Sequence, residues 1–416
     1  MAGSSSDVKL KQGPREVTRG RPRVKTGADV LVDTNFAALA GRRVGLVTNQ
    51  TGLVNGEHLV DLMHREEDVT LAAILGPEHG FRGTVEAGFA VKGGIDPATG
   101  VRVFSLYGKT RKPTQAMLRN IDVLVFDIQD IGARFYTYIS TMGLAMQAAA
   151  KAGIPFLVLD RPNPLGGNTV SGHILEPRYN SFVGQYPIPI LHGMSVGELA
   201  QMIKGEKWLP GLDQLDLQVI EVQGWQRKMR WPETGLAWVA TSPNIPTFIS
   251  SLVYPGVGIV GETQLVNEGR GTPEPFTLIG APWLNAQRLT KRLNALGLPG
   301  VKFEATRYTP RSIPKVAAKP LFVGRSINGV RIRVTNPAQV QPLELGIHML
   351  ALLIVEARSR GVKKLFAKPV WFHHIAGTKR LYRMLVKGAS GRAIVRSWRS
   401  EVALFERQRA PYLLYQ

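Results

Sequence analysis

The octapeptide GPEHGFRG at residues 76–83 combines a carboxylic acid, an imidazole and a guanidinium with three glycines. Glycine lets the backbone and a ligand approach each other closely. A carboxylic acid held in such a loop can transfer a proton, and an arginine can bind a carboxylate or a phosphate. We therefore take Glu78 as a candidate general acid and Arg82 as a candidate anion ligand. His79 is either a substrate contact or a group that only orients a neighbouring carboxylate.

Polar residues also follow three other apolar runs, which end at residues 48, 126 and 159. Carboxylates on both sides of a bound sugar can act as acid and as base or nucleophile, and tyrosines can stack on the sugar. Two alternatives stay open, namely that Asp127 caps a turn and that Asp160 and Arg161 form an internal ion pair. The candidates are Asn49 after the first run, Asp127, Gln129, Asp130, Arg134, Tyr136 and Tyr138 after the second, and Asp160, Arg161 and Asn163 after the third.

The remaining candidates lie further along the chain. His192, in the sequence LHGM, suits either a pocket wall or a substrate contact. Asn244 lies in the sequence SPNIP, and Glu268 and Arg270 lie in the glycine-rich segment 261–272. This segment is either a loop that closes over the site or an ordered linker, and ligand sites often lie where domains meet.

The elements that position these residues alternate between apolar, β-rich runs and helical patterns. Such alternation predicts an α/β fold with a parallel sheet covered on both faces. Because ligands bind beyond the carboxyl ends of parallel strands, the polar loops are expected to share one site. The expected strands are 44–48, 69–75, 101–106, 123–128, 155–160 and 217–222, and the clearest helices of this part are 138–152 and 195–205.

The length of 416 residues favours two domains. The Pro- and Gly-rich stretch 243–261 is the expected boundary, which gives a disordered basic arm at 1–26, a catalytic domain at 27–250 and a smaller α/β domain at 251–416. In this last part the patterns predict strands at 302–307 and 330–334 and helices at 286–296, 343–358, 379–387 and 393–408.

The composition limits the possible functions. The net charge is +21, and the basic residues concentrate in the first 26 residues and after residue 357. Such a field attracts polyanions, either nucleic acid or anionic cell-wall polymers, although no nucleic-acid-binding motif is present. With no cysteine, disulfides and thiolate chemistry are excluded. No run is apolar enough for a membrane span and no signal peptide is visible, so we expect a cytoplasmic protein unless an export signal is missing from the sequence.

Several site chemistries find no support. The chain has no dinucleotide fingerprint, no P-loop and no nucleophile elbow. The histidines at 173, 192, 373 and 374 lack metal-ligand spacing. A carboxylate metal site built from Glu78, Asp127 and Asp130 is conceivable, but nothing in the sequence specifies one, so we expect neither a metal nor a cofactor.

Five motifs, in this order, resemble those of the NamZ-type exo-β-N-acetylmuramidase family, and the resemblance runs from about residue 30 to residue 415. They are EHG-RG at 78–83, FDIQDIGARFYTY at 126–138, DRPNP at 160–164, SPNIP at 242–246 and NEGRGT at 267–272.

The resemblance implies a Rossmann-like N-terminal domain, a smaller α/β C-terminal domain and an active site between them. It also implies hydrolysis that releases terminal N-acetylmuramic acid from the non-reducing end of peptidoglycan fragments without a cofactor. Glu78 would then be the general acid and Asp127 or Asp130 the second carboxylate. The lactyl carboxylate of the sugar would explain the nearby Arg82, Arg134, Arg161 and Arg270.

Two other classes of function remain open at this point. One is a sugar- or peptidoglycan-binding protein without catalysis, and the other is a metal-dependent hydrolase that uses the same carboxylates. A chelator would inactivate only the second of these.

Overall fold

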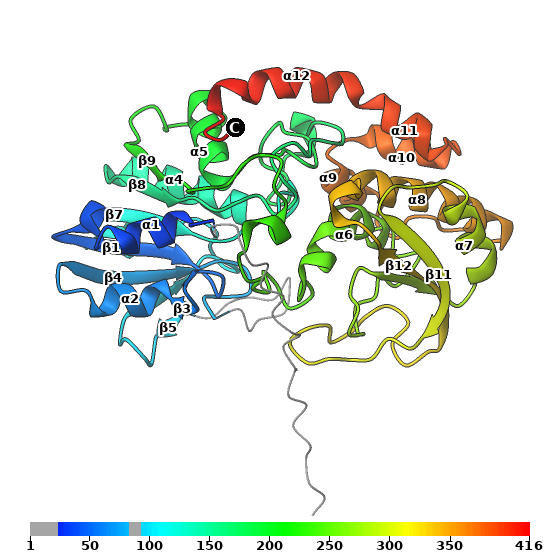
Figure 1. Cartoon of the computed structure of the whole chain (residues 1–416), viewed down its shortest axis with the longest axis horizontal. Coiled ribbons are helices and arrows are strands. Elements are labelled where there is room, and N and C mark those ends of the chain that lie inside the picture. The colour runs from blue at the N-terminus through cyan, green and yellow to red at the C-terminus, as the bar shows by residue number, and fades with distance from the viewer. Residues whose placement is uncertain (1–23, 83–92) are drawn as a thin grey trace, which may run out of the picture.

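The computed structural model describes residues 24–82 and 93–416, so the predicted arm up to residue 23 and Gly83 of the first motif lie outside the described residues. The first half is built on a seven-stranded sheet, in which neighbouring strands are parallel except for β5 and β6 (Figure 1). From edge to edge the strands are β5 (Gly94–Ile95), β6 (Arg102–Ser105), β4 (Val69–Gly76), β1 (Arg42–Thr48), β7 (Val123–Asp127), β8 (Phe156–Leu159) and β9 (Leu217–Ile220).

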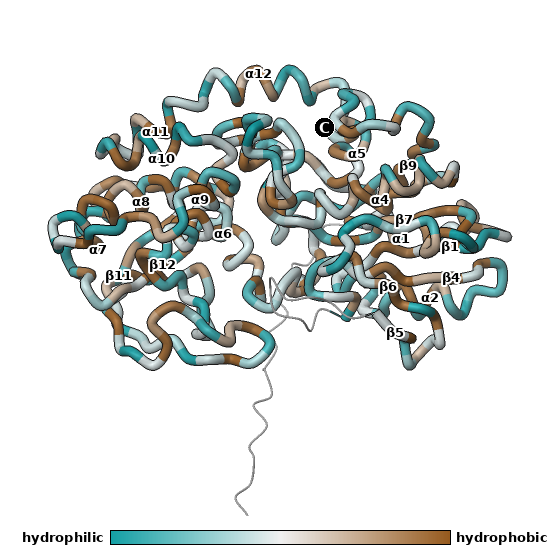
Figure 2. The backbone as a smooth tube through the Cα atoms, turned by 180° about the vertical axis from the view of Figure 1, so that it is seen from behind, coloured by the Kyte–Doolittle hydropathy of each residue, from teal (hydrophilic) through white to brown (hydrophobic). Residues whose placement is uncertain are grey.

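The apolar runs become strands because both faces of the sheet are covered, and the tube of Figure 2 is correspondingly hydrophobic along β4 and β7. Leu46 and Val125 pack with α1 (Gly27–Asp33) and α2 (Leu59–Arg65) on one face. Val47 and Phe126 pack on the other face with α3 (Gln115–Leu118), α4 (Tyr138–Ala152) and α5 (Val196–Gly205). The α/β class and the six strands predicted in this half are confirmed, with end points that differ by one or two residues.

Short elements complete the first half. A small hairpin joins β1 to α2, and α5 begins with a capping box of Ser195 and Glu198. The hairpin strands are β2 (Leu53–Val54) and β3 (Glu57–His58), and the 3-10 helices of the chain are η1 (Ala37–Leu39), η2 (Pro177–Tyr179), η3 (Trp231–Thr234), η4 (Pro337–Gln339) and η5 (Ala410–Tyr412).

The stretch 243–261, predicted as a boundary from its composition, contains the buried helix α6 (Phe248–Gly261). Its glycines serve helix packing rather than a flexible link. A Cβ on Gly256 would lie 2.2 Å from the carbonyl oxygen of Pro342, and Gly256 faces Gly346 of α8 (Pro342–Ser359). The two helices therefore approach backbone to backbone, which only glycine permits.

The second half is a three-stranded antiparallel sheet with helices packed against it. Its strand order is β10 (Leu278–Ala281), β12 (Ile327–Val334) and β11 (Val301–Tyr308). Besides α8, the helices are α7 (Ala286–Asn294), α9 (Pro369–Ala376), α10 (Lys379–Val386), α11 (Gly391–Ser397) and α12 (Arg399–Arg409). The predicted single helix at 393–408 is two helices, because Trp398 ends α11 and precedes α12. In the described parts of the chain, no helix has the length and apolar character that a membrane span requires.

The end of the chain returns to the first half, where α12 arches over both halves (Figure 1). The Tyr415 hydroxyl donates to Asp160 Oδ2 at 2.5 Å and accepts from the backbone N–H of Val222 at 2.9 Å. Arg409 donates to the carbonyl oxygens of Gly167 and His192. The last residues of the predicted C-terminal domain are thus part of the packing of the first half.

The chain start is also tied to this surface. Lys25 forms a β-bridge with Gln223, and Thr26 caps α1 with Asp29. Val24 is buried, and the backbone N–H groups of Lys25 and Gln223 each donate to the other residue's carbonyl oxygen. Residues 24–26 therefore belong to the fold and not to the predicted disordered arm.

We expect Tyr415→Phe to lower the free energy of unfolding by about 1–3 kcal/mol, because it leaves a buried carboxylate without one of its donors. Urea unfolding measures this. The matched control is Tyr412→Phe, whose hydroxyl bonds the more exposed Glu206, and its effect should be smaller. Equal effects of the two substitutions would contradict the importance of the Tyr415–Asp160 contact.

Candidate active site

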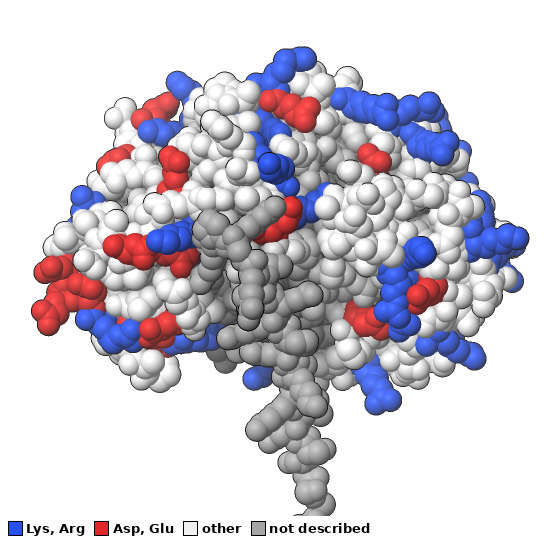
Figure 3. Space-filling model, viewed as in Figure 1, with Lys and Arg blue, Asp and Glu red and all other residues white. Residues whose placement is uncertain are grey.

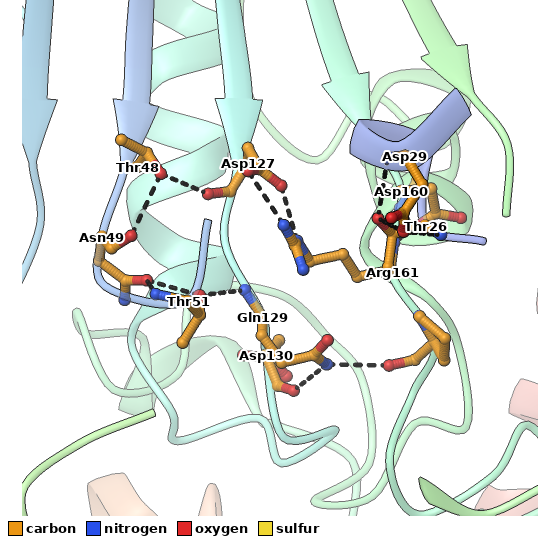
Figure 4. A network of polar contacts seen from close by, with 12 residues as sticks. Thr26, Asp29, Thr48, Asn49, Thr51, Asp127, Gln129, Asp130, Asp160 and Arg161 are labelled. Atoms are coloured by element: carbon orange, nitrogen blue, oxygen red, sulfur yellow. Dashed lines mark hydrogen bonds and ion pairs between the residues drawn. The ribbon is translucent and has the colours of Figure 1, made fainter. Parts of the chain in front are cut away.

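The carboxyl ends of β1, β7 and β8 lie side by side and are joined by a network of polar contacts (Figure 4). Asn49 Oδ1 accepts from the backbone N–H and the hydroxyl of Thr51, at 2.9 and 2.6 Å. The Thr51 hydroxyl accepts from the backbone N–H of Gln129, and Gln129 Nε2 donates to the carbonyl oxygens of Asp130 and Pro162. As the sequence predicts, these loops meet at one edge of the sheet.

Asp127 is sealed inside this edge. Arg161 grips its carboxylate with two hydrogen bonds, Nε to Oδ1 at 2.6 Å and Nη2 to Oδ2 at 3.0 Å. The Asp127 side chain has no exposed surface and that of Arg161 is 5% exposed. The sequence leaves open an internal ion pair of Arg161 with Asp160, but in the structure the partner of Arg161 is Asp127. This pair joins β7 to the loop after β8, and neither side chain is open to a ligand in this structure.

Asp160 turns toward α5 instead. Its carboxylate accepts from the Ser195 hydroxyl and the Gly197 backbone N–H as well as from Tyr415. Burial raises the pKa of Asp160 to about 6, against the effect of these donors. The carboxylate therefore fixes the start of α5 and the end of the chain.

Three other candidates have their polar groups directed into the fold. Asn163 donates to the Met194 carbonyl oxygen. The guanidinium of Arg134 is buried and donates to the carbonyl oxygens of His173, Ile188 and Ile375. His192 accepts from the Met194 backbone N–H, and burial, followed by the charges of Arg409 and Arg134, lowers the pKa of His192 to about 3.

Glu78 lies at the end of β4 in a sharply turned loop. His79 and Gly80 both have left-handed backbone conformations, with φ of 70° and 78°, and the Gly80 N–H bonds the carbonyl of Pro77. Glu78 Oε2 accepts from the Thr137 hydroxyl at 2.6 Å, and the Tyr107 hydroxyl also hydrogen-bonds this carboxyl group. Glu78 is partly exposed, whereas His79 is buried.

Arg82 leaves the same loop but turns to the side. It donates to Asp96 at 2.9 Å and its guanidinium lies 4.2 Å from the centre of the Phe81 ring. Asp61 is a second, more distant acidic neighbour, at 3.9 Å. These contacts hold Arg82 on carboxylates of the protein itself.

Tyr254 of α6 brings the second half of the chain to Glu78. Burial raises the pKa of Tyr254, the charge of Arg270 opposes this shift, and the carboxylates of Glu262, Glu78 and Glu268 add to it. The charges of Glu78, in the loop after β4, and of Glu262 and Glu268, after α6, therefore all act on the Tyr254 hydroxyl. Glu262 and Glu268 of the segment 261–272 thus act on the same tyrosine as Glu78.

Within this segment, Glu268 and Arg270 form an ion pair at 2.8 Å. The Arg270 side chain is 37% exposed and that of Glu268 is 9% exposed, so this pair, unlike that of Asp127 and Arg161, reaches solvent through its arginine. A Cβ on Gly261 would lie 3.0 Å from Glu268 Cδ, so the glycine makes room for the carboxylate. Glu262 accepts from the indole N–H of Trp371, a partly exposed ring of α9.

The two tyrosines of the second motif form a wall behind the network. Tyr138 donates to the Thr241 carbonyl oxygen at 2.6 Å, and Tyr136 donates to the Thr241 hydroxyl at 2.8 Å. Both rings are buried and meet edge to face. Asn244, a few residues on, donates to the carbonyl oxygen of Val316 and so links this loop to the second half.

Several buried polar atoms at the edge of the sheet have no hydrogen-bond partner within the described residues. Three of them belong to candidate residues and are Asn49 Nδ2, Gln129 Oε1 and Asp130 Oδ1. Unpaired buried groups of this kind are costly and are typical of sites that bind water or a ligand. Asp130 Oδ2 accepts from the Gly132 backbone N–H at 2.6 Å, yet burial still raises the pKa of Asp130 to about 7.

Four residues at the site escaped prediction, namely Tyr107, Thr137, Tyr254 and Thr241. Thr137 lies within the second motif, and its place between two candidate tyrosines was the available signal. Tyr107 and Tyr254 come from segments with no polar motif, so only the fold reveals them. Among residues 24–82 and 93–416, no three His, Asp or Glu side chains are grouped in a way that would hold a metal ion.

The described architecture, a parallel α/β sheet joined to a second α/β unit, recurs in solved structures. Two DUF1343 family proteins from Bacteroides fragilis NCTC 9343 share it. One is 40% identical, with a TM-score of 0.87 over 95% of this chain and 100% of the other. The second is 34% identical, with a TM-score of 0.77 over 95% of this chain and 99% of the other.

Sequence comparison gives the family. Residues 44–249 match the N-terminal pattern of exo-β-N-acetylmuramidase NamZ, and residues 252–415 match its C-terminal pattern. The chain is also 41% identical to a peptidoglycan β-N-acetylmuramidase NamZ from Bacillus subtilis strain 168, over 100% of this chain and 97% of the relative. The chain belongs to the NamZ family, as the five motifs predict.

The raised pKa of Asp130 gives a prediction on stability. An aspartate of the unfolded chain titrates near 3.8, so between about pH 4 and pH 7 the folded state binds more protons than the unfolded state. The contribution of Asp130 is full below that range and is lost as the pH rises through about 7. We expect Asp130→Asn to remove this loss, as urea unfolding at several pH values would measure.

A control of opposite sign is Asp122→Asn. The hydrogen bonds from Arg43 lower the pKa of Asp122 to about 2, so the contribution of Asp122 is lost as the pH falls. If Asp130→Asn left the pH dependence of unfolding between pH 4 and pH 7 unchanged, Asp130 would not be the buried acid described above.

Proposed function

We propose that this protein is an exo-acting glycosidase that releases terminal β-linked N-acetylmuramic acid from the non-reducing end of peptidoglycan fragments. The observation that carries the proposal is the 41% identity, over the full chain, to a peptidoglycan β-N-acetylmuramidase. The site supports it with acidic side chains from both halves of the chain whose charges act on Tyr254. Hydrolysis of a glycosidic bond by carboxyl groups needs no cofactor.

In this proposal Glu78 is the general acid that protonates the glycosidic oxygen as the bond breaks. Thr137 and Tyr107 both hold its carboxyl group through hydroxyls. A hydroxyl can donate to a carboxylate and accept from a carboxylic acid. The same two contacts therefore orient Glu78 before and after it gives up its proton.

For the second carboxylate we propose Glu268 in place of Asp127 or Asp130. Asp127 is enclosed by Arg161, and burial favours the neutral form of Asp130. By contrast, the charges of Glu268 and Glu78 both act on Tyr254, and the ion-pair partner of Glu268, Arg270, reaches solvent. A carboxylate in this position can activate water or stabilise the developing positive charge on the sugar.

For the lactyl carboxylate of the substrate we propose Arg270 as the ligand. Of the four arginines expected to bind it, Arg134 and Arg161 are buried in contacts within the fold. Arg82, although 42% exposed, is held by Asp96 and lies over the Phe81 ring, away from Glu268. Arg270 is partly exposed beside Glu268, and a guanidinium can bridge two carboxylates through its several N–H groups. The unpaired Asn49 Nδ2 and Gln129 Oε1 would bond the polar groups of the sugar.

The first test is the release of free N-acetylmuramic acid from a chromogenic β-N-acetylmuramide by the wild type and by Glu78→Gln. We expect the substitution to lower kcat by about 10²–10⁴-fold, because it removes the proton donor, while binding of the sugar persists. The matched control is Glu304→Gln, a surface glutamate paired with Arg333, which should be fully active. Absence of turnover in the wild type would favour a binding protein, and loss of turnover with a chelator would favour a metal-dependent hydrolase.

The role of Arg270 has its own test. We expect Arg270→Gln to reduce kcat/KM for the muramide by about 10–100-fold, the usual value of one charge-assisted hydrogen bond, and to change any turnover of the matching N-acetylglucosaminide much less. Arg333→Gln, which also loses an arginine paired with a glutamate, is the control. An equal loss on both sugars would mean that Arg270 does not recognise the lactyl group.

A further inference from the structure

A basic surface formed by α10, α11 and the start of α12 has no part in the site. Residues 379–399 contain no acidic residue. All the basic side chains of this segment are exposed, and Figure 3 shows Lys and Arg gathered where these helices lie. This basic surface consists of Lys379, Arg380, Arg383, Lys387, Arg392, Arg396 and Arg399.

The helices expose these charges because their apolar residues face inward. Leu381 and Leu385 of α10 and Ile394 of α11 are buried in the core of the second half. The amphipathic pattern thus fixes the basic residues on the outer side, where they cannot turn into the fold. Within the part of the chain that the structure describes, Arg380 forms an ion pair with Glu401, and the charge of Arg399 acts on the nearby Glu344.

The field of this surface reaches the residues beneath it. Burial, followed by the charges of Lys379, His374 and Arg383, lowers the pKa of His373. Burial and the charge of Arg392 lower that of His348. Positive potential therefore extends across the outer helices, and such a surface attracts polyanions.

The chemistry of the surface favours a phosphodiester polymer without bases. Proteins that hold single-stranded nucleic acid use exposed aromatic rings for base stacking. In this segment the aromatic residues are Trp398, which is buried, and Tyr382, which packs against Phe366 and His373. The segment also contains no Asn or Gln to bond base edges.

We propose that this basic surface binds the anionic, phosphodiester-containing polymers that are attached to peptidoglycan. The proposal rests on the proposed function, since the two ligands are then parts of one wall. Attachment through the polymer would raise the local concentration of glycan ends at the site without any new contact there. The contacts would be charge pairs with phosphates, so binding should weaken steeply with salt.

The test compares Lys379→Gln/Arg383→Gln/Lys387→Gln with a control that loses equal charge at exposed positions elsewhere, Lys291→Gln/Lys302→Gln/Arg325→Gln. Both are full-length chains with the N-terminal arm. The probe is cell-wall sacculi that carry their phosphodiester polymer, together with the same sacculi after its chemical removal, and the readout is co-sedimentation at several salt concentrations.

We expect the α10 variant to bind the polymer-bearing sacculi at least about tenfold more weakly than the wild type, with a salt dependence smaller by about two to three charge units. The control should bind like the wild type, and all three should bind the stripped sacculi weakly and equally. Both variants should hydrolyse the chromogenic muramide normally, because the surface lies outside the site. This separates failure of the present proposal from failure of the proposed activity.

Three outcomes would overturn the proposal. One is equal binding of the α10 variant and the control to the polymer-bearing sacculi. Another is unchanged binding after the polymer is removed, which would assign binding to the glycan. The third is preferential binding of duplex DNA over the wall polymer at equal phosphate concentration, which would identify the surface as a nucleic-acid site.

Discussion

The relative position of the two halves depends on one buried cation, the guanidinium of Arg134. A charge removed from water must be compensated by hydrogen bonds. Arg134 finds them at the carbonyl oxygens of His173 and Ile188 in the first half and Ile375 of α9 in the second. A Cβ on Gly377 would lie 2.4 Å from its Nη2, so the guanidinium also fixes the turn after α9. Movement of the second half would take one of these three acceptors away from the buried charge.

The same principle divides the polar groups at the edge of the sheet into two sets. Asp127 with Arg161, and Asp160 with Ser195 and Tyr415, have their charges satisfied inside the protein. These contacts hold the strand ends and α5 together. Outside this sealed set lie the partly exposed Glu78 and the ion pair of Glu268 with Arg270. The sealed set builds the edge of the sheet, whereas Glu78 and the pair of Glu268 with Arg270 reach its surface through Glu78 and Arg270.

This division explains how far the sequence could predict the site. The strands were predictable because a sheet covered on both faces requires continuous apolar runs, and the loops at their carboxyl ends then had to meet. The helix α6 could not be predicted from its composition, because its glycines are explained only by the packing of Gly256 against Gly346 of α8. Arginines of the four loops looked alike in sequence. Whether each one meets a ligand, a carboxylate or a carbonyl depends on residues up to about 240 positions away, as Arg134 and Ile375 illustrate.

The surroundings of Glu78 show that the fold gives up local stability to orient this carboxyl group. His79 has a left-handed backbone conformation. Residues other than glycine adopt this conformation at a cost, and only where the surrounding structure enforces it. Thr137 occupies the N-cap position of α4, where a threonine hydroxyl normally bonds the free N–H groups of the helix. Its hydroxyl instead donates to Glu78. A side-chain cap stabilises a helix by about 0.5–2 kcal/mol, and α4 lacks this contribution from Thr137. The loss is explained if the orientation of the Glu78 carboxyl group matters more than the stability of the start of the helix. A group that transfers a proton along a fixed line needs such an arrangement before the substrate arrives.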